Sequence, residues 1–110
     1  MNSRVLLDTH TLVWLAFADR RLGHMARTLV EDAFKDDAVF VSAISFFEIA
    51  ALCRRERLHL YEEAAAWRSG VLQRGITEVP LTGDIGVAAA GLSGLPGDPA
   101  DRIITATAQK

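Results

Sequence analysis

The chain alternates between short apolar runs and longer segments in which apolar residues recur at helical spacing. Apolar runs occur within residues 4–8 and 38–41, and we expect a third strand over residues 76–81. A short apolar run that lacks polar alternation, as at residues 4–8, is typical of a strand buried on both faces. We expect helices over six further segments, which are residues 9–18, 24–35, 42–57, 62–74, 82–92 and 98–109.

Residues that favour helix ends lie at the boundaries of these segments. Ser42 is a preferred N-cap residue for the helix after the second strand, and Ser45 to Glu48 repeats the capping-box spacing. Thr82 similarly opens a later helix, and Gly75 can adopt the left-handed conformation that stops the helix before it. These residues support the predicted boundaries.

Strands that alternate with helices are joined by right-handed crossovers, which place the strands parallel in one sheet. We therefore predict an α/β fold, a three-layer α/β/α sandwich with a mostly parallel sheet. A single domain over residues 1–110 is expected, since no repeat or linker divides the sequence. In such sheets ligands bind beyond the carboxyl ends of the strands.

The composition restricts the class of protein. Cys53 is the single cysteine in 110 residues, which excludes an internal disulfide and predicts a reducing compartment such as the cytoplasm. We predict neither a secretory signal nor a membrane span, because Asp8 interrupts the first apolar run and Glu48 interrupts the longest, at residues 39–53. The formal net charge of −2 provides no general attraction for nucleic acid.

Two carboxylates interrupt apolar segments. Asp8 follows the first predicted strand directly, but aspartate is also a preferred N-cap, so the start of the next helix alone explains it. Glu48 is harder to explain, because it lies in mid-helix near Ile44, Ala51 and Leu52, with no lysine or arginine within one turn. Such a glutamate either extends to solvent or points into a cleft, and we favour the cleft.

A third acidic site is the segment Gly-Asp-Pro-Ala-Asp-Arg at residues 97–102. Asp98 as N-cap, Pro99 at the first helical position and Asp101 at the third are strong helix-start signals, which explain both acids without a function. Asp101 nevertheless begins an apolar helix that we expect to be buried. The parallel topology would bring this helix end close to the other two acids.

Three clustered carboxylates would require neutralisation. At about 6 Å and an effective dielectric constant of about 20, each pair repels by roughly 3 kcal/mol. Three pairs would rival the stability of a whole domain, roughly 5 to 15 kcal/mol. Either the acids are not clustered, or a cation or shared protons neutralise them. Carboxylates without a cysteine or histidine cluster favour Mg²⁺ or Mn²⁺, which suggests hydrolysis of phosphodiesters.

Three motifs, in this order, resemble those of the PIN-domain ribonucleases of the VapC toxin type. They are LLDTHTLVWL, then VSAISFFEIAAL followed by RRERLHL, then ITEVPLTGDIGVAAAGLSGLPGDPADRIITATA. The resemblance extends from residue 5 to about residue 108. It implies a three-layer α/β/α fold with an acidic Mg²⁺ or Mn²⁺ pocket that cleaves RNA. It also implies a homodimer and a cognate antitoxin that covers apolar helix surface and blocks the pocket.

The resemblance assigns roles to individual residues. Asp8 matches the acid of the first Leu-Asp-Thr motif, Glu48 the acid of the central helix, and Asp101 the acid before an Ile-Ala-Thr-rich helix. These three are the implied catalytic residues and metal ligands. Asp98 matches the first acid of the Asp-Pro-x-Asp-Arg variant and is implied as a further metal ligand. Small hydroxyls flank the family's pocket at two matching positions, Thr9 and Ser42.

The sequence departs from the family pattern at its C-terminus. Family members continue with a strand of the type Leu-x-Thr-x-Asp or Asn, whose acid completes the pocket, and this sequence stops at Lys110 before such a strand. Three hypotheses follow, namely a C-terminally truncated chain, an open edge on the first strand that invites another chain, and weak metal affinity.

Cationic and aromatic residues are weaker candidates. Arg54 and Arg55 end a helix, where cations favour the helix dipole without further function. Contact with RNA phosphates is a second interpretation for them and for Arg102, which adjoins the acids. We expect Trp14 and Trp67 to be buried in the core or against a partner, not to stack on bases. The three histidines lack metal-ligand spacing.

The leading hypothesis is therefore an endoribonuclease toxin that uses Mg²⁺ or Mn²⁺ and binds an antitoxin. The alternative is a catalytically inactive PIN-like scaffold that binds an antitoxin or RNA, and it rests on the missing final acid. A phosphatase or receiver domain with a strand-end aspartate is a third interpretation. The lack of a second aspartate two residues after Asp8 and of a strand-end lysine weakens it.

Overall fold

The fold is built on a sheet of three parallel strands, in a computed structural model that describes residues 4–92 and 98–110. The strands comprise Val5–Leu7, Val39–Ser42 and Thr77–Val79, and they pair in the order β1-β2-β3. Val5 lies opposite Val39 across the first pair. Because the strands are parallel, their carboxyl ends meet at one edge of the sheet, and the residues that follow β1 and β2 become neighbours.

Helices form in all six segments where the sequence predicts them. They are α1 (Thr9–Ala16), α2 (His24–Lys35), α3 (Ala43–Arg54), α4 (Ala64–Gln73), α5 (Gly83–Ala90) and α6 (Pro99–Ala108). The hydroxyls of Ser42 and Thr82 accept hydrogen bonds from amides of the helices that follow them, and Gly75 has a φ of 101° after α4. These capping predictions are confirmed.

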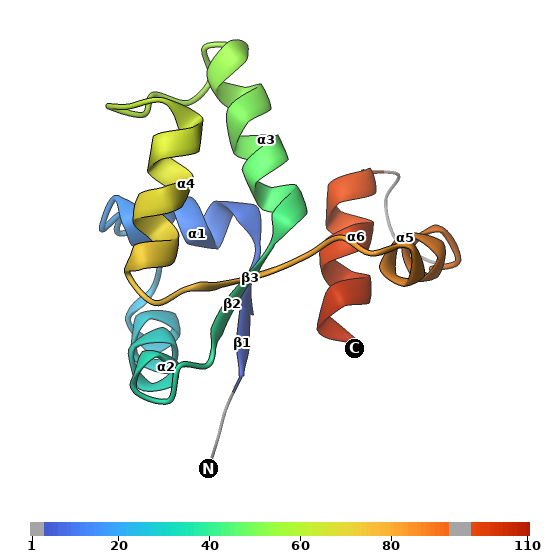
Figure 1. Cartoon of the computed structure of the whole chain (residues 1–110). Helices are drawn as coiled ribbons and strands as arrows, with labels where there is room; N and C mark the ends of the chain where they lie inside the picture. Colours follow the sequence, from blue (N-terminus) through green and yellow to red (C-terminus); the bar gives the residue numbers. More distant parts are fainter. Residues whose placement is uncertain (1–3, 93–97) are drawn as a thin grey trace.

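The helices form layers on the two sides of the sheet (Figure 1). Helices α1, α2 and α4 lie on one side, α5 and α6 lie on the other, and α3 extends beyond the carboxyl end of β2 to pack against α1, α4 and α6. The main core comprises Leu7, Leu12, Val30, Ala33, Ala38, Val39, Val41, Ile49, Val71 and Ile76. Burial of each large member contributes roughly 1.5 to 3 kcal/mol. The predicted α/β sandwich is confirmed.

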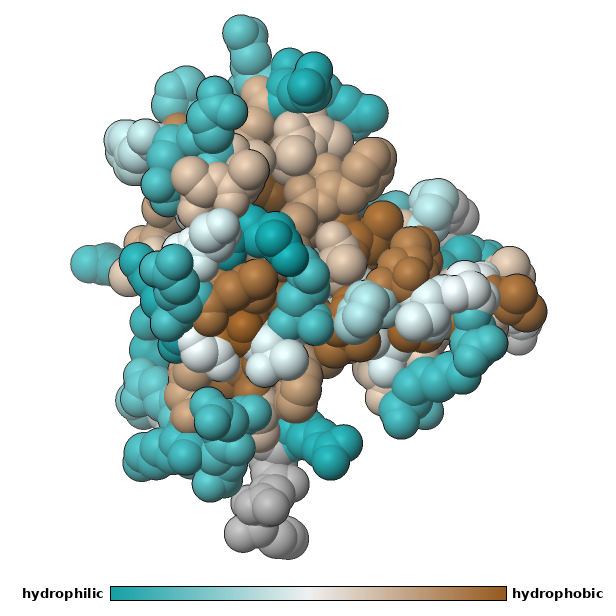
Figure 2. Space-filling view, in the orientation of Figure 1, coloured by the Kyte–Doolittle hydropathy of each residue, from teal (hydrophilic) through white to brown (hydrophobic). Residues whose placement is uncertain are grey.

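The side of the sheet that faces α6 is less completely covered. A smaller apolar cluster joins α5 to α6 through Ile85, Ala89 and Ala106, and Figure 2 shows brown surface around these helices. Between α6 and the sheet, Leu6 and Phe40 line a hollow of about 580 Å³. Within the described residues β1 pairs with β2 and with no other strand, so the open edge expected for β1 is present.

None of the described helices is both long and apolar enough to cross a membrane.

Candidate active site

Asp8 lies where β1 ends and α1 begins. It is the N-cap of α1, and its Oδ1 accepts a hydrogen bond of 2.8 Å from the amide of Thr11. The residue is exposed. A carboxylate has two oxygens with about four acceptor sites, so the capping bond leaves acceptor capacity on Asp8. Its structural role as a cap and a role as a ligand are therefore compatible.

Thr9 connects the start of α1 to the middle of α3. Its hydroxyl oxygen lies 3.0 Å from Oγ of Ser45 and is hydrogen-bonded to Oε1 of Glu48. A carboxylate oxygen accepts, so Thr9 donates its one hydroxyl proton to Glu48 and accepts the proton of Ser45. Thr9 and Ser45 are both buried. The contact forms a short chain of hydrogen bonds that ends on the Glu48 carboxylate.

This chain of hydrogen bonds shows how Glu48 is held. The side chain is half-buried and bonded to the first turn of α1, so it does not extend freely to solvent. Within the described residues no buried side-chain nitrogen or oxygen lacks a hydrogen-bond partner. An unpaired buried hydroxyl here would cost about 1 to 3 kcal/mol, so the Thr9 and Ser45 pair stabilises the fold and also orients Glu48.

Ser45 is a site residue that the sequence interpretation assigned to a different task. The spacing of Ser45 and Glu48 matches a capping box, in which Ser45 would be the N-cap, but α3 begins at Ala43 and Ser45 lies inside it. Its hydroxyl bonds to Thr9, on another helix. A serine one turn before Glu48 on an otherwise apolar helix was the available signal, because a buried hydroxyl needs a partner.

Ser42 is the last residue of β2 and is 1% exposed. Its Oγ accepts a hydrogen bond of 3.2 Å from the amide of Ile44, so it caps α3. By fixing where α3 leaves β2, Ser42 determines the position of Glu48 relative to α1. The contact that the structure gives for the Ser42 side chain is this helix cap.

The acids of the third motif lie at the N-terminus of α6. Asp98 caps the helix, with Oδ1 3.1 Å from the amide of Ala100, and Asp101 is exposed in the first turn. Helix α6 packs against α3, the helix that carries Glu48. Both acids also lie where the helix dipole favours negative charge. The helix start therefore explains their positions, whatever further role they have.

Arg102 has a structural role. Its Nη1 donates to the carbonyl oxygens of Ala89 at 3.3 Å and of Leu92 at 2.7 Å, at the C-terminal end of α5. A cation at that end is favoured by the helix dipole. Arg102 thus fastens α5 to α6, which is the contact that positions the first turn of α6.

Arg54 and Arg55 are exposed at the C-terminal end of α3. Arg54 lies six residues after Glu48, about 9 Å further along the helix axis. The helix dipole accounts for cations at this end.

The described residues contain no group of three or more His, Cys, Asp or Glu side chains that is placed to hold a metal ion. The candidate metal ligands at the carboxyl edge of the sheet are carboxylate oxygens, the ligand type that Mg²⁺ and Mn²⁺ prefer. Thr9 links Glu48 to the first turn of α1, the helix that Asp8 caps, and Asp98 and Asp101 lie at the start of α6, a helix that packs against α3.

Comparison with known proteins gives a family assignment. A profile described as PIN domain matches residues 5–110. A relative named Ribonuclease VapC22, from Mycobacterium tuberculosis (strain ATCC 25618 / H37Rv), is 38% identical over 105 residues, which cover 94% of this chain and 78% of the relative. No solved structure matches the chain.

Proposed function

The chain belongs to the PIN domain family as a VapC-type member, and we propose that it is an endoribonuclease toxin that hydrolyses RNA phosphodiester bonds. The observation that carries the proposal is the contact of Thr9 with Glu48. This contact holds a carboxylate of α3 against the first turn of α1, the helix that Asp8 caps, at the edge of the sheet where ligands of parallel α/β folds bind.

The proposed cofactor is Mg²⁺ or Mn²⁺. Mg²⁺ keeps several waters and is commonly bound by one or two carboxylates together with substrate phosphates, so a complete set of three protein carboxylates is not required beforehand. Asp8 and Glu48 would hold the ion, and Asp101 and Asp98 would add ligands from α6. When bound, the ion would offset the charge of the phosphodiester and favour ionisation of an attacking water.

The side chains of the site have distinct tasks in this proposal. Asp8 and Glu48 each use one carboxylate oxygen in a structural hydrogen bond, which fixes the direction of the other. Thr9 and Ser45 hold Glu48 and are positioning residues. Fixed orientation matters because ligands that are misplaced by about 1 Å lose much of their effect on rate.

An antitoxin and a second copy of the chain are the proposed protein partners. Large apolar side chains remain exposed on several helices, which is unusual for a monomer when such residues gather in patches. On the helices they are Met25, Leu29, Phe47 and Val87, and Phe17, Tyr61 and Leu81 are exposed in the segments between the helices. Phe47 directly precedes Glu48, so a protein that covers this part of α3 would also restrict access to the site.

An inactive PIN-like scaffold that binds an antitoxin or RNA is the second candidate function. The observation that favours it is the lack of a preformed group of three metal-binding side chains in the described part of the chain. The two candidates differ in their response to metal. If the site is active, Mn²⁺ should stabilise the fold of the wild-type protein and should not stabilise Asp8→Asn. If the protein is a scaffold, Mn²⁺ should stabilise neither.

The direct test is cleavage of single-stranded RNA in Mg²⁺ by the wild-type protein and by Asp8→Asn. Asparagine keeps an N-cap oxygen, so α1 should still form. We expect the variant to lose at least about 100-fold in rate, in keeping with the loss of a principal catalytic group. Equal cleavage by the two proteins would refute the proposed active site.

A further inference from the structure

The solvent side of α1 carries a stack of planar side chains that the proposed catalytic residues do not use. The ring centroids of His10 and Trp14 are 6.1 Å apart, and the guanidinium carbon of Arg21 lies 5.5 Å from the centroid of the Trp14 ring. His10 and Trp14 are one helical turn apart, on the side of α1 opposite buried Leu12. The His10 ring is tilted by 47° to the Trp14 ring, so the three groups form a contiguous cluster, called the stack below, whose planes are not all parallel.

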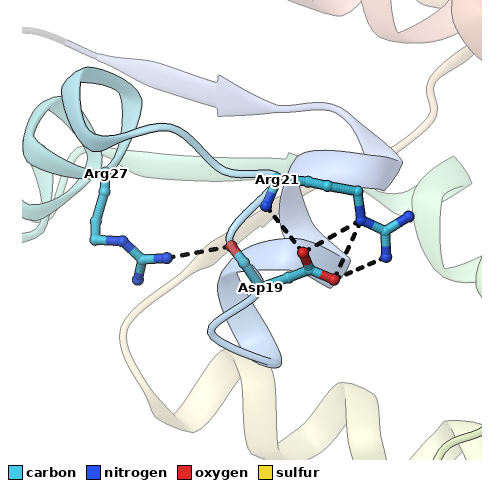
Figure 3. A network of polar contacts seen from close by, with 3 residues as sticks. All are labelled: Asp19, Arg21 and Arg27. Carbon is cyan, nitrogen blue, oxygen red and sulfur yellow. Dashed lines mark hydrogen bonds and ion pairs between the residues drawn. The ribbon is translucent and has the colours of Figure 1, made fainter.

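Asp19 holds the guanidinium of Arg21 in place (Figure 3). Nε of Arg21 is 3.2 Å from each carboxylate oxygen, and Nη2 is 2.7 Å from Oδ2. Hydrogen bonding to Arg21 lowers the pKa of Asp19 to about 2, so the pair stays ionised at neutral pH. The Arg21 side chain is still 70% exposed, which leaves its planar group accessible to a ligand.

The segment from the end of α1 into the first turn of α2 is basic, although the whole chain is slightly acidic. Residues 17–27 contain three arginines and one aspartate, against a formal net charge of −2 for the chain. Arg20 is exposed, and Arg27 reaches back from α2 so that its Nη2 is 3.4 Å from the carbonyl oxygen of Asp19 (Figure 3). Asp19 neutralises the charge of Arg21 in an ion pair, so Arg20 and Arg27 give this surface an excess of positive charge.

Planar groups next to positive charges are the features that bind single-stranded nucleic acid. Bases stack on aromatic rings and on arginine planes, and neighbouring cations bind the phosphates. The stack begins at His10, two residues after Asp8. Trp14 lies about 9 Å from Asp8 along the helix axis, since each residue advances by about 1.5 Å. Asp8 lies one turn before Leu12 and thus on the other side of α1 from His10 and Trp14, so an RNA strand that passes Asp8 reaches the stack by curving around the first turn of the helix.

We propose that His10, Trp14 and Arg21 form a base-stacking subsite for single-stranded RNA next to the cleaved phosphate, with Arg20 and Arg27 binding the flanking phosphates. The subsite rests on the ribonuclease function proposed above. It places RNA contact on α1 and on the connection that follows it, whereas the sequence alone had predicted that Trp14 is buried in the core or against a partner.

Tryptophan emission tests the subsite directly. The chain has two tryptophans, and Trp67 packs against the main core, so the Trp67→Phe variant leaves Trp14 as the reporter. This variant is titrated with a short single-stranded RNA in EDTA, which prevents metal-dependent cleavage during the titration. We expect saturable quenching of Trp14 emission. In the Trp14→Phe variant, where Trp67 is the reporter, RNA should leave the emission unchanged.

Three further variants separate stacking from charge. Arg21→Lys keeps the positive charge and removes the planar group, and we expect RNA to bind about 5- to 10-fold more weakly. Arg20→Gln should bind a few-fold more weakly, and the slope of log affinity against log salt should fall by about 0.7 for one lost phosphate contact. Lys35→Gln is the matched control, because Lys35 ends α2 just before β2, at the opposite edge of the sheet, and should bind as the wild type does.

The outcomes distinguish this subsite from the function on which it rests. If the wild-type protein binds and cleaves RNA, but Trp14 emission does not change and Arg21→Lys binds normally, the subsite is refuted and the ribonuclease proposal stands. If the wild-type protein neither binds RNA, as measured by anisotropy of labelled RNA, nor cleaves it, both are refuted. Quenching of Trp14 together with weaker binding by Arg21→Lys supports the subsite.

Discussion

Replacing Thr9 by valine should release Glu48 from α1 with little change in side-chain volume. The Thr9 hydroxyl accepts from Ser45 and donates to Glu48, and Ser45 is 0% exposed. In the variant the Ser45 hydroxyl loses its partner where water does not reach it, which costs about 1 to 3 kcal/mol. Glu48 is half-buried and can be hydrated, so its lost bond costs about 1 kcal/mol.

We therefore expect Thr9→Val to lower the free energy of unfolding by about 2 to 4 kcal/mol, a large part of the roughly 5 to 15 kcal/mol of a typical domain. Urea unfolding of the wild type, Thr9→Val, Ser45→Ala and the double variant measures it. In the double variant an apolar pair replaces the buried hydroxyl pair. The double variant should therefore lose at least about 1 kcal/mol less free energy of unfolding than the sum of the losses in the two single variants. Thr9→Ser keeps the hydroxyl and should be close to the wild type.

The same variants test the positioning role in catalysis. Removing a partner that orients a metal ligand typically costs about 10- to 100-fold in metal affinity or activity. RNA cleavage by Thr9→Val in saturating Mn²⁺, at a temperature where the variant is folded, should fall in that range, and Thr9→Ser should restore most of it. Additive stability losses and wild-type cleavage by Thr9→Val would refute the reasoning.

Three further predictions concern contacts outside the site. Glu78→Gln should remove a pH dependence of stability. The bidentate bond from Arg68 lowers the pKa of Glu78, so the wild-type pair stabilises the fold at neutral pH, and this stability is lost as pH falls from 4.5 through the lower folded-state pKa. Thermal unfolding between pH 3 and 7 should show a difference of up to about 1 kcal/mol, since both side chains are partly exposed. Arg102→Met should cost about 1 to 3 kcal/mol, because two carbonyls at the end of α5 lose a charged donor, and hydrogen exchange should rise in α5 before it rises in the main core. Gly75→Ala should cost about 1 kcal/mol in urea unfolding although its Cβ meets open space, because φ is 101° there.

The order and type of the structural elements could be predicted from the sequence, because their signals are local. Ser42, Thr82 and Asp98 lie at helix starts and Gly75 lies after a helix end, and each acts through backbone groups only a few residues away. Boundaries were less accurate. The third helix ends at Arg54 rather than near residue 57, since its last turn depends on how the chain turns into α4.

The candidate site was predictable in part. Asp8 and Glu48 stood out because a carboxylate at the end of an apolar strand or within an apolar helix requires a reason, and the structure places Glu48 against α1. The pairing of Ser45 with Thr9 could not be predicted, because it joins residues 36 positions apart and depends on the crossing of α1 and α3. The stack of Trp14 with Arg21 was missed for a similar reason, since a loop brings the arginine back over the helix.

Anomalous diffraction from crystals soaked in Mn²⁺ tests the central claim most directly. We predict a manganese peak that contacts carboxylate oxygens of both Asp8 and Glu48. Binding of manganese elsewhere, or a well-ordered site that holds none at saturating concentration, would contradict the proposed metal-dependent ribonuclease.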